Sequence, residues 1–327
     1  MEEQKKQNFF ERFASSKGSI TDFFTILYDK LTHLGRTNIE MGIMHLRAGQ
    51  FYDAAVRFKI ARWFDKNNPI VHYLLGKAYV YDGKRHKAIA PLQKALELDP
   101  KLHEAEFLLL LCGSGSTLPE IPRSFVIERN DLVADNYAVA LPEGTLTSIA
   151  KKLIDEIPRY FENWQGFTVL DLGCMGGEYG SLMKSKASTM VGVEPSLKMA
   201  AIARSKRDGE ILVYNKISAR FPEDYIKETD EKYQVVMSIQ YLSNFARVEW
   251  FFALVRARFV DAGGVFIFTI TPSDTGQNRF YPEKILFMHS EKYVDESLAA
   301  NNFKIHKKVE VTYESGMVDL IYFAETI

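Results

Sequence analysis

An internal repeat in the first half of the chain restricts its fold more than any other feature of the sequence. Residues 41–64 (MGIMHLRAGQFYDAAVRFKIARWF) align with residues 75–98 (LGKAYVYDGKRHKAIAPLQKALEL), so that matched positions lie 34 residues apart. The matched pairs are Gly42 and Gly76, Gly49 and Gly83, Ala54 and Ala88, Phe58 and Leu92, and Ala61 and Ala95. This period is that of stacked helix–turn–helix units, each of which buries its apolar face against the next.

The residue types at the matched positions agree with the mechanics of such a unit. Glycine at Gly42 and Gly76 would let the two helices of a pair approach closely. Gly49 and Gly83 fall where each unit must turn, and glycine readily adopts the positive φ angles that turns require. We therefore predict two helical pairs, with a further helix at about residues 102–112.

Residues 36–112 resemble the tetratricopeptide repeat (TPR) family, with two repeats and the following helix as a cap. The resemblance implies an all-α domain whose concave groove holds a protein or peptide partner. The segment carries twelve Lys and Arg against eight Asp and Glu, so an acidic peptide tail is one expected ligand. The alternatives are a solvated helix face and a surface that docks on the chain's own second domain.

Two further segments flank this array. Residues 1–35 contain an amphipathic stretch, ITDFFTILYDKLTHLG, which we expect to form an N-terminal helical cap because terminal repeats need covering. Residues 113–125 are rich in Gly, Ser and Pro and are predicted to be an interdomain linker. The expected domains are therefore 1–35, 36–112 and 126–327, with the linker at 113–125.

The composition argues against several classes of protein. A formal net charge of −1 gives no global attraction to nucleic acid or to anionic membranes. Cys112 and Cys174 are the only cysteines and can form neither a disulfide framework nor a zinc site. No metal is therefore expected, and a reducing, cytoplasmic setting is favoured. No apolar run approaches the roughly 18 residues that a membrane span requires.

The sequence pattern changes beyond residue 126. Short β-rich runs alternate with helical stretches, which is typical of a parallel sheet covered by helices on both faces. The runs are FTVLDLG, TMVGVE, EILVYN, YQVVMSI and GGVFIFTI. At the end of the chain, NFKIHKKVEVTY and MVDLIYFAE flank a turn at residues 314–316. They predict a hairpin that adds antiparallel strands at one edge of the sheet.

The first of these strands leads into a glycine-rich turn. Residues 169–180 (VLDLGCMGGEYG) place Asp171 at the end of the strand and residues 173–177 at the start of a helix. Ligands bind at the carboxyl ends of parallel strands, where helix N-terminal amides also point. The next strand ends in Glu194, 23 positions after Asp171, where a carboxylate can accept both hydroxyl groups of a ribose. Turn and acid together predict a nucleoside site.

This loop, D-L-G-C-M-G-G, resembles the D-L-G-C-G-x-G loop of class I S-adenosylmethionine-dependent methyltransferases. The resemblance covers residues 126–327 and includes VGVEPSLKMAAIAR, NKISARFPED, YQVVMSIQYLSNF and LVRARFVDAGGVFIFTI. It implies an α/β fold with a seven-stranded Rossmann-like sheet and a C-terminal antiparallel hairpin, here preceded by an all-α TPR domain. The chain is similar to bacterial TPR-containing methyltransferases, and the implied activity is methyl transfer to a small-molecule or protein substrate.

The resemblance also implies roles for individual residues. S-adenosylmethionine would be held by the turn, by the acid after the second strand and by polar residues at later strand ends. These cofactor-binding residues are Asp171, Gly173, Cys174, Met175, Gly177, Glu194, Ser218, Ser238 and Gln240. Catalytic candidates are Tyr241 and His289, with Asn244 and Tyr137 as further residues near substrate or cofactor. Because the sulfonium is already activated, catalysis can consist mainly of aligning a nucleophile.

Three positions depart from the family pattern. Met175 replaces a loop glycine, Ser218 replaces the usual adenine-reading acid, and Gln234 replaces an aspartate at the start of the fourth strand. The Met175 side chain can point into the helix interface, or it can fill the pocket for the methionine part of the cofactor. The second case would make the chain a non-catalytic TPR scaffold with a degenerate methyltransferase domain. An NAD-binding oxidoreductase is a third hypothesis.

Overall fold

The computed structural model describes residues 20–137, 147–259 and 263–327, with side chains from residue 33 onward. The chain divides into two compact units, Met1–Ser116 and Thr117–Ile327, and each is described here by itself. The division falls within the segment expected to be a linker. Residues 1–19 of the expected N-terminal cap lie outside the described residues.

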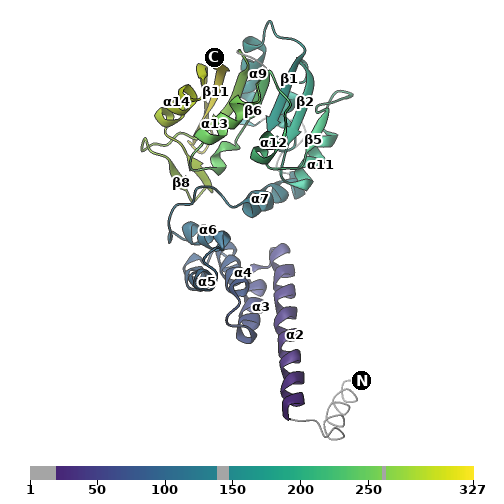
Figure 1. The fold of residues 1–327 in the computed structure, drawn as a ribbon, viewed down its shortest axis with the longest axis vertical. Helices are drawn as coiled ribbons and strands as arrows, with labels where there is room; N and C mark the ends of the chain where they lie inside the picture. The colour runs from purple at the N-terminus through teal and green to yellow at the C-terminus, as the bar shows by residue number, and fades with distance from the viewer. Residues whose placement is uncertain (1–19, 138–146, 260–262) are drawn as a thin grey trace. The chain divides into compact units, whose positions relative to one another are not determined.

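The first unit is all-helical in its described part (Figure 1). Its helices are α2 (Ile20–Arg47), α3 (Phe51–Phe64), α4 (Pro69–Tyr81), α5 (Arg85–Leu98) and α6 (His103–Leu111). Consecutive helices pack against one another along the chain. The start of α4 shows why a helix begins there, since the Asn68 side chain accepts hydrogen bonds from the N–H groups of Ile70 and Val71.

The sequence repeat corresponds to a repeated packing contact. A side chain at Gly42 would place its Cβ 2.5 Å from the Phe58 ring, and one at Gly76 would place it 2.5 Å from Leu92. Phe58 and Leu92 are fully buried, so each glycine lets the helices of a pair close over one large apolar side chain. The glycine in the turn of each pair has a φ of 72°. The predicted helical pairs and the need for glycine at their turns are therefore confirmed.

The expected boundary between cap and first repeat is not a break in the structure. Helix α2 continues through residues 35 and 36, because the hydroxyl of Thr37 and the amide of Asn38 donate to carbonyls four residues earlier instead of capping a new helix. The first helix of the repeat is thus the C-terminal part of a 28-residue helix. Neither α2 nor another helix in the described ranges has the length and apolar character needed to cross a membrane.

The second unit is built around a seven-stranded sheet with the order β10-β11-β7-β6-β1-β2-β5. Its strands are β1 (Phe167–Leu172), β2 (Ala187–Val193), β5 (Lys216–Ser218), β6 (Val235–Ser238), β7 (Val265–Ile270), β10 (Phe303–Thr312) and β11 (Val318–Thr326). The strands from β5 to β7 are parallel, whereas β11 runs antiparallel to both β7 and β10. The predicted C-terminal hairpin is confirmed. Its first strand, β10, lies at the edge of the sheet, and its second strand, β11, lies between β10 and β7.

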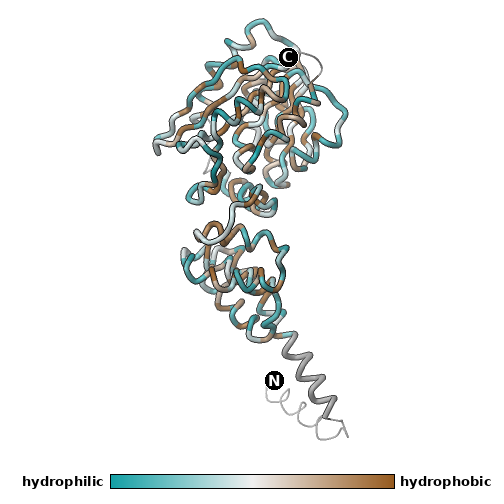
Figure 2. The backbone as a smooth tube through the Cα atoms, turned by 60° about the vertical axis from the view of Figure 1, so that its left-hand side comes forward, coloured by the Kyte–Doolittle hydropathy of each residue, from teal (hydrophilic) through white to brown (hydrophobic). Residues whose placement is uncertain are grey.

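Helices cover both faces of this sheet (Figure 1). They are α7 (Arg123–Asp135), α9 (Ser148–Tyr160), α10 (Glu178–Ser181), α11 (Leu197–Ser205), α12 (Pro222–Glu228), α13 (Glu249–Arg256) and α14 (Glu291–Ala300), with the 3₁₀ turn η1 (Leu242–Asn244). Successive residues of β1 point into two cores: Val169 packs with α9, and Leu170 packs with α12, α13 and α14. Figure 2 shows hydrophobic stretches gathered in the interior of the unit.

One strand differs from the sequence-based expectation. The run EILVYN does not join the sheet: β4 (Ile211–Leu212) pairs only with β3 (Arg207–Asp208) in a small hairpin. Gly209, with a φ of 59°, permits the tight turn between them. The sheet strand is the following segment, β5, because Val213 and Tyr214 turn inward as buried side chains before the chain reaches the sheet edge.

A second small hairpin also had no counterpart in the sequence-based expectation. It consists of β8 (Arg279–Tyr281) and β9 (Leu286–Met288), which lie between β7 and α14. Its turn contributes Lys284 and Ile285 to the wall of a cavity at the end of the main sheet. The hairpin therefore helps to shape a cavity at which several strand ends meet.

Candidate functional site

A cavity of about 220 Å³ lies at the carboxyl ends of the parallel strands. Its walls come from α7, the β1–α10 loop, the end of β2, the segment after β6 and the β8–β9 turn. The lining residues are Arg129, Asn130, Val133, Gly173, Met175, Glu194, Ile239, Gln240, Tyr241, Ser243, Asn244, Lys284, Ile285 and Leu286. This edge of an open α/β sheet is where such folds bind their ligands.

Backbone strain is concentrated around this cavity. Met175, Gln240 and Ile285 have φ angles of 49°, 61° and 53°, and they are three of the four non-glycine residues with positive φ in the described ranges. All three line the cavity. A left-handed conformation costs about 1–2 kcal/mol for a residue that has a Cβ. Such strain persists where surrounding contacts hold it, and it clusters at functional sites.

The glycine loop runs directly beneath two aromatic rings. Gly173 and Gly177 have φ angles of 76° and 90°. A side chain at Gly173 would place its Cβ 2.7 Å from the Tyr241 ring, and one at Gly177 would place it 2.8 Å from the Tyr214 ring. The loop therefore needs glycine both for its backbone conformation and for the close approach of these rings.

Glu194 lies at the end of β2, buried at the cavity wall, and both of its carboxylate oxygens accept hydrogen bonds. Oε2 accepts the backbone N–H of Met175 at 3.2 Å, and Oε1 accepts the Asn130 amide and the Ser196 N–H, each at 2.9 Å. Burial raises the pKa of Glu194 above its usual value, although these three donors act in the opposite direction. Glu194, the acid predicted from its spacing after Asp171, thus accepts a hydrogen bond directly from the backbone of the glycine loop.

Asp171 lies beneath the loop and does not line the cavity. Its Oδ2 accepts the hydroxyl of Tyr214 at 2.6 Å. Burial raises the pKa of Asp171 to about 7, although the Tyr214 hydroxyl lowers it. Because the Tyr214 ring also packs on Gly177, Asp171 supports the loop through Tyr214.

Four of the nine predicted cofactor-binding residues line the cavity: Gly173, Met175, Glu194 and Gln240. The other five lie outside its lining: Asp171, Cys174, Gly177, Ser218 and Ser238. Ser218 touches the site through its backbone, since its carbonyl accepts the Glu194 N–H at 3.0 Å. Ser238 is fully buried, and its hydroxyl has no hydrogen-bond partner in the described ranges. A contact of these five side chains with a cofactor stays a prediction.

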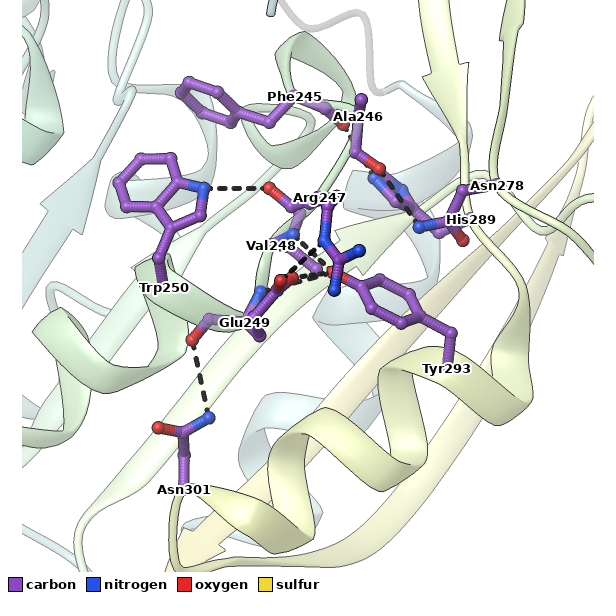
Figure 3. A network of polar contacts seen from close by, with 10 residues as sticks. All are labelled: Phe245, Ala246, Arg247, Val248, Glu249, Trp250, Asn278, His289, Tyr293 and Asn301. Atoms are coloured by element: carbon purple, nitrogen blue, oxygen red, sulfur yellow. Dashed lines mark hydrogen bonds and ion pairs between the residues drawn. The ribbon is translucent and has the colours of Figure 1, made fainter. Parts of the chain in front are cut away.

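His289 lies in the core and not at the cavity, which corrects the prediction that it faces the substrate as a base. Its Nε2 lies 2.8 Å from the carbonyl of Phe245, and burial lowers the pKa of His289 to about 4. Figure 3 shows it within a polar network in which Asn278 donates to the Ala246 carbonyl and Tyr293 accepts the Val248 N–H. His289 therefore helps to order the segment before α13.

Tyr241, the other catalytic candidate, does line the cavity. Its hydroxyl, however, donates to the carboxylate of Glu223 at 2.7 Å, and Glu223 also pairs with Arg123 at 2.8 Å. Burial raises the pKa of Tyr241 well above its usual value. Tyr241 is thus a neutral phenol whose ring forms the wall over Gly173, and a part for it in proton transfer stays a prediction.

Several lining residues carried no signal in the sequence. Arg129 and Asn130 belong to α7, which precedes the first strand, while Lys284, Ile285 and Leu286 belong to the β8–β9 hairpin. Neither segment contains a motif: α7 has the pattern of an ordinary helix, and the turn has that of a surface loop. Only the folded contacts bring these two segments to the same cavity as the glycine loop.

The polar groups around the cavity fit the expected nucleoside with an amino acid arm. The Glu194 carboxylate offers about four acceptor positions, and one of its three donors is the cavity-lining side chain of Asn130, which a ribose hydroxyl can replace. Against Gly176 on the far side of the loop lie two buried atoms without hydrogen-bond partners in the described ranges, Oη of Tyr137 and Oε1 of Glu178. Neither residue lines the cavity, so the acceptor capacity offered to a ligand there comes from Glu194.

Solved structures of other proteins share the fold of the second unit. The chain is similar to magnesium protoporphyrin IX methyltransferase of Synechocystis, solved with bound S-adenosylhomocysteine, with a TM-score of 0.51, 16% identity and coverage of 62% of this chain and 99% of that one. It is also similar to a [4+2]-cyclase, with a TM-score of 0.51, 17% identity and coverage of 64% and 99%. At such identity the likeness concerns the fold alone, and one fold can host several chemistries.

Sequence comparison is more specific. Ubiquinone biosynthesis O-methyltransferase of Rhizobium johnstonii is 30% identical over 116 residues, covering 35% of this chain and 45% of the relative. The enzyme of the same name from Rhizobium etli is 31% identical over 109 residues, covering 32% and 42%. The chain thus spans less than half the length of these relatives.

A family model described as a methyltransferase domain matches residues 146–323, more than half of the chain. Because this match includes the glycine loop and Glu194, the chain belongs to the methyltransferase domain family of class I S-adenosylmethionine-dependent enzymes.

Proposed function

We propose that this protein binds S-adenosylmethionine in the cavity at the strand ends and transfers its methyl group to an oxygen atom of a small-molecule acceptor. One observation carries the proposal: a single cavity joins Glu194 and Gly173 to the residues after β6, Gln240 and Tyr241. Groups suited to a nucleoside therefore share one cavity with residues of the segment after β6. The relatives named as O-methyltransferases support an oxygen acceptor.

In this proposal the residues of the chain bind and align. S-adenosylmethionine, when bound, supplies a methyl group already activated on a sulfonium. Glu194 holds the ribose hydroxyls, with its carboxylate kept in place by the Met175 and Ser196 N–H groups. The Gln240 N–H donates to the Thr269 hydroxyl at 2.7 Å, which fixes the strained segment after β6 that would face the cofactor. Precise alignment of a nucleophile can account for a large part of the rate of such a transfer.

Glu194 is not a suitable general base, because its oxygens are already engaged by three N–H donors. Ser243 also lines the cavity, but its hydroxyl donates to the Gln240 carbonyl at 2.8 Å. The other titratable residues of the described lining are Arg129, Tyr241 and Lys284, and the Tyr241 hydroxyl donates to Glu223. The proposal therefore assigns catalysis to alignment and to the charge of the acceptor itself.

Calorimetric titration of the full-length protein with S-adenosylhomocysteine tests the proposal. We expect micromolar binding, and no heat at high micromolar ligand would overturn it. Glu194→Gln should weaken binding by about tenfold or more, since a neutral amide accepts hydroxyl protons less strongly than a carboxylate. Asp319→Asn is the matched control, because Asp319 is also buried but lies outside the cavity lining.

We further infer that residues 36–112 form two TPR repeats whose groove receives an acidic protein partner. Support comes from the repeated glycine contacts and from lysines placed over tyrosine rings: Lys59 over Tyr79 at 5.5 Å and Lys84 over Tyr52 at 5.3 Å. Titration of the full-length protein with a poly-glutamate peptide, against its glutamine counterpart as control, tests this inference. Equal binding of the two peptides, or none, would contradict it.

A further inference from the structure

The most unusual charged group in the second unit is the guanidinium of Arg129. It lies on α7 at the cavity wall, and burial lowers the pKa of Arg129 below its usual value. It forms one hydrogen bond in the described ranges, from Nη2 to the side-chain oxygen of Asn244 at 3.0 Å. Burying a cation is costly unless an anion compensates it. By accessible surface, however, the side chain is only half-buried, so its remaining N–H donors can meet solvent or an anionic ligand.

Glu194 does not occupy these donors. Its charge favours the protonated guanidinium, but the two side chains form no hydrogen bond or ion pair. The oxygens of Glu194 are taken by Met175, Asn130 and Ser196. A guanidinium has five N–H donors. The donors of Arg129 that form no hydrogen bond are not among the fully buried polar atoms that lack a partner. These donors are therefore accessible to solvent, at a residue that lines the cavity.

The rest of the cavity wall also carries positive charge, beside apolar side chains. Lys284, in the β8–β9 turn, is the second cation of the lining, and Glu194 is the sole carboxylate of the described lining. Val133, Ile239, Ile285 and Leu286 supply apolar surface between them. The wall thus combines two cations with an apolar surface, which suits a ligand that has an apolar body and an anionic end.

We propose that the acceptor carries a carboxylate, and that Arg129 binds it with Lys284 as a second contact. This inference rests on the proposed function, since it names the class of acceptor for the same cavity. Arginine suits this role because its planar fork matches the two oxygens of a carboxylate. The hydrogen bond to Asn244 orients the guanidinium from the segment that follows β6, which is the acceptor side of the cavity.

The same chemistry has a second source, because the amino acid arm of S-adenosylmethionine also ends in a carboxylate. Two adenosyl compounds separate the sources: S-adenosylhomocysteine has that carboxylate, and 5′-methylthioadenosine lacks it. If Arg129 holds the acceptor, Arg129→Gln leaves the affinities for both compounds within about threefold of wild type. If Arg129→Gln weakens the binding of S-adenosylhomocysteine by about tenfold and leaves the binding of 5′-methylthioadenosine unchanged, Arg129 holds the carboxylate of the cofactor and the proposal is overturned.

The acceptor itself is probed with matched acids and amides: benzoate with benzamide, indole-3-acetate with indole-3-acetamide, and hexanoate with hexanamide. Each is titrated into the full-length protein with and without S-adenosylhomocysteine. We expect at least one acid to bind about tenfold tighter than its amide, and Arg129→Gln to remove most of that preference. Arg123→Gln is the control on the same helix, because Arg123 pairs with Glu223 and Asp224 outside the cavity lining.

Two results of these titrations would overturn the proposal: no preference for the acid in any pair, or a preference that Arg129→Gln leaves intact. Arg129→Lys keeps the charge and loses the fork, so it should retain part of the preference if binding is bidentate. If S-adenosylhomocysteine fails to bind, the proposed function fails, while the ratio of acid to amide affinity in the protein alone still decides this inference.

Discussion

The glycines of the helical unit and those of the β1–α10 loop look alike in sequence but act differently in the structure. Gly42 and Gly76 lie inside helices, and what they provide is room for a large neighbour, Phe58 or Leu92. Gly173 and Gly177 have positive φ angles and also lie against aromatic rings. The two glycines inside helices serve packing alone, whereas Gly173 and Gly177 combine packing with positive φ angles, and Gly173 also lines the cavity.

The same contrast holds for buried polar groups. Among the described side chains, the helical unit buries Asn38 and His72, whereas the sheet unit buries the carboxylates of Asp171, Glu194, Glu223 and Asp319. Burying a carboxylate costs free energy unless it accepts hydrogen bonds. Each of the four accepts hydrogen bonds, yet burial still raises the pKa of Asp171, Glu194 and Asp319. The carboxylate at the cavity wall, Glu194, is the one that the proposed ligand needs.

The largest expected effect sharpens this contrast through the pH dependence of stability. Burial raises the pKa of Asp171 to about 7, against about 3.9 in the unfolded chain. Asp171 therefore favours folding most below about pH 4, and that contribution is lost as the pH rises towards 7. Relative to Asp171→Asn, the wild type should lose about 3 kcal/mol of unfolding free energy between about pH 4 and pH 7.

Urea unfolding of both proteins at several pH values measures this difference. Fluorescence of Trp164 and Trp250 reports on the sheet unit when Trp63 of the helical unit is changed to Phe. Asparagine can still accept the Tyr214 hydroxyl, so the substitution removes the ionisation and keeps the hydrogen bond. A difference between the two proteins that does not vary with pH would contradict the raised pKa of Asp171.

The next effect tests whether the loop glycines have two functions. Gly173→Ala should destabilise the sheet unit by about 2–4 kcal/mol, because it adds the strain of a positive φ to a clash with Tyr241. Gly209→Ala is the matched control, since Gly209 has a φ of 59° and no atom within 4 Å of the added Cβ. Gly209→Ala should cost about 1–2 kcal/mol. Equal losses of unfolding free energy in urea for Gly173→Ala and Gly209→Ala would show that the contact with Tyr241 is unimportant.

A smaller effect tests the independence of the two units. Gly76→Ala should destabilise the helical unit by about 1–2 kcal/mol, because overpacking against Leu92 outweighs the better helix propensity of alanine. Affinity for S-adenosylhomocysteine, measured by calorimetry, should not change. Adding Leu92→Ala should relieve the overlap, so that the double variant loses less than the sum of the single ones. A change in affinity would show that the two units are coupled.

The smallest effect concerns the residue that departs from the glycine loop pattern. Met175→Gly should stabilise the sheet unit by up to about 1 kcal/mol. Glycine adopts the φ of 49° without strain, which favours the folded state. Glycine also gains more entropy on unfolding, which offsets part of this stabilisation. Affinity for S-adenosylhomocysteine should stay within about threefold of wild type. A gain of more than about tenfold would mean that the Met175 side chain obstructs the site.

Much of the fold could be predicted because its signals are local. The 34-residue spacing predicted the helical pairs, and the switch to short β-rich runs predicted the sheet and its C-terminal hairpin. The third strand was wrong, since EILVYN looks like a strand but belongs to the β3–β4 hairpin, and the sheet edge is the short β5. Which apolar run joins the sheet depends on distant pairing partners, and propensity does not report these.

The candidate site was predicted in part for the same reason. Gly173 and Glu194 line the cavity, and the sequence singled them out because loop and acid belong to adjacent strand ends at a fixed spacing. Their contact with a cofactor stays a prediction. His289 was misplaced, because its position after a strand does not reveal that its ring turns into the core towards the Phe245 carbonyl. Arg129 and Lys284 were missed, since they come from a helix and a hairpin far from the loop in sequence.

By itself the sequence determined where the chain turns, where helices give way to strands, and that a glycine loop and an acid lie at the first strand ends. These features depend on residues a few positions apart, whose backbone preferences and periodicity act locally. Only the tertiary structure decided that Arg129, Asn130 and Lys284 share a cavity with that loop, and that the Asn130 amide binds the Glu194 carboxylate. Such contacts arise from packing across long sequence separations, so each depends on the whole fold and not on its own neighbours in the chain.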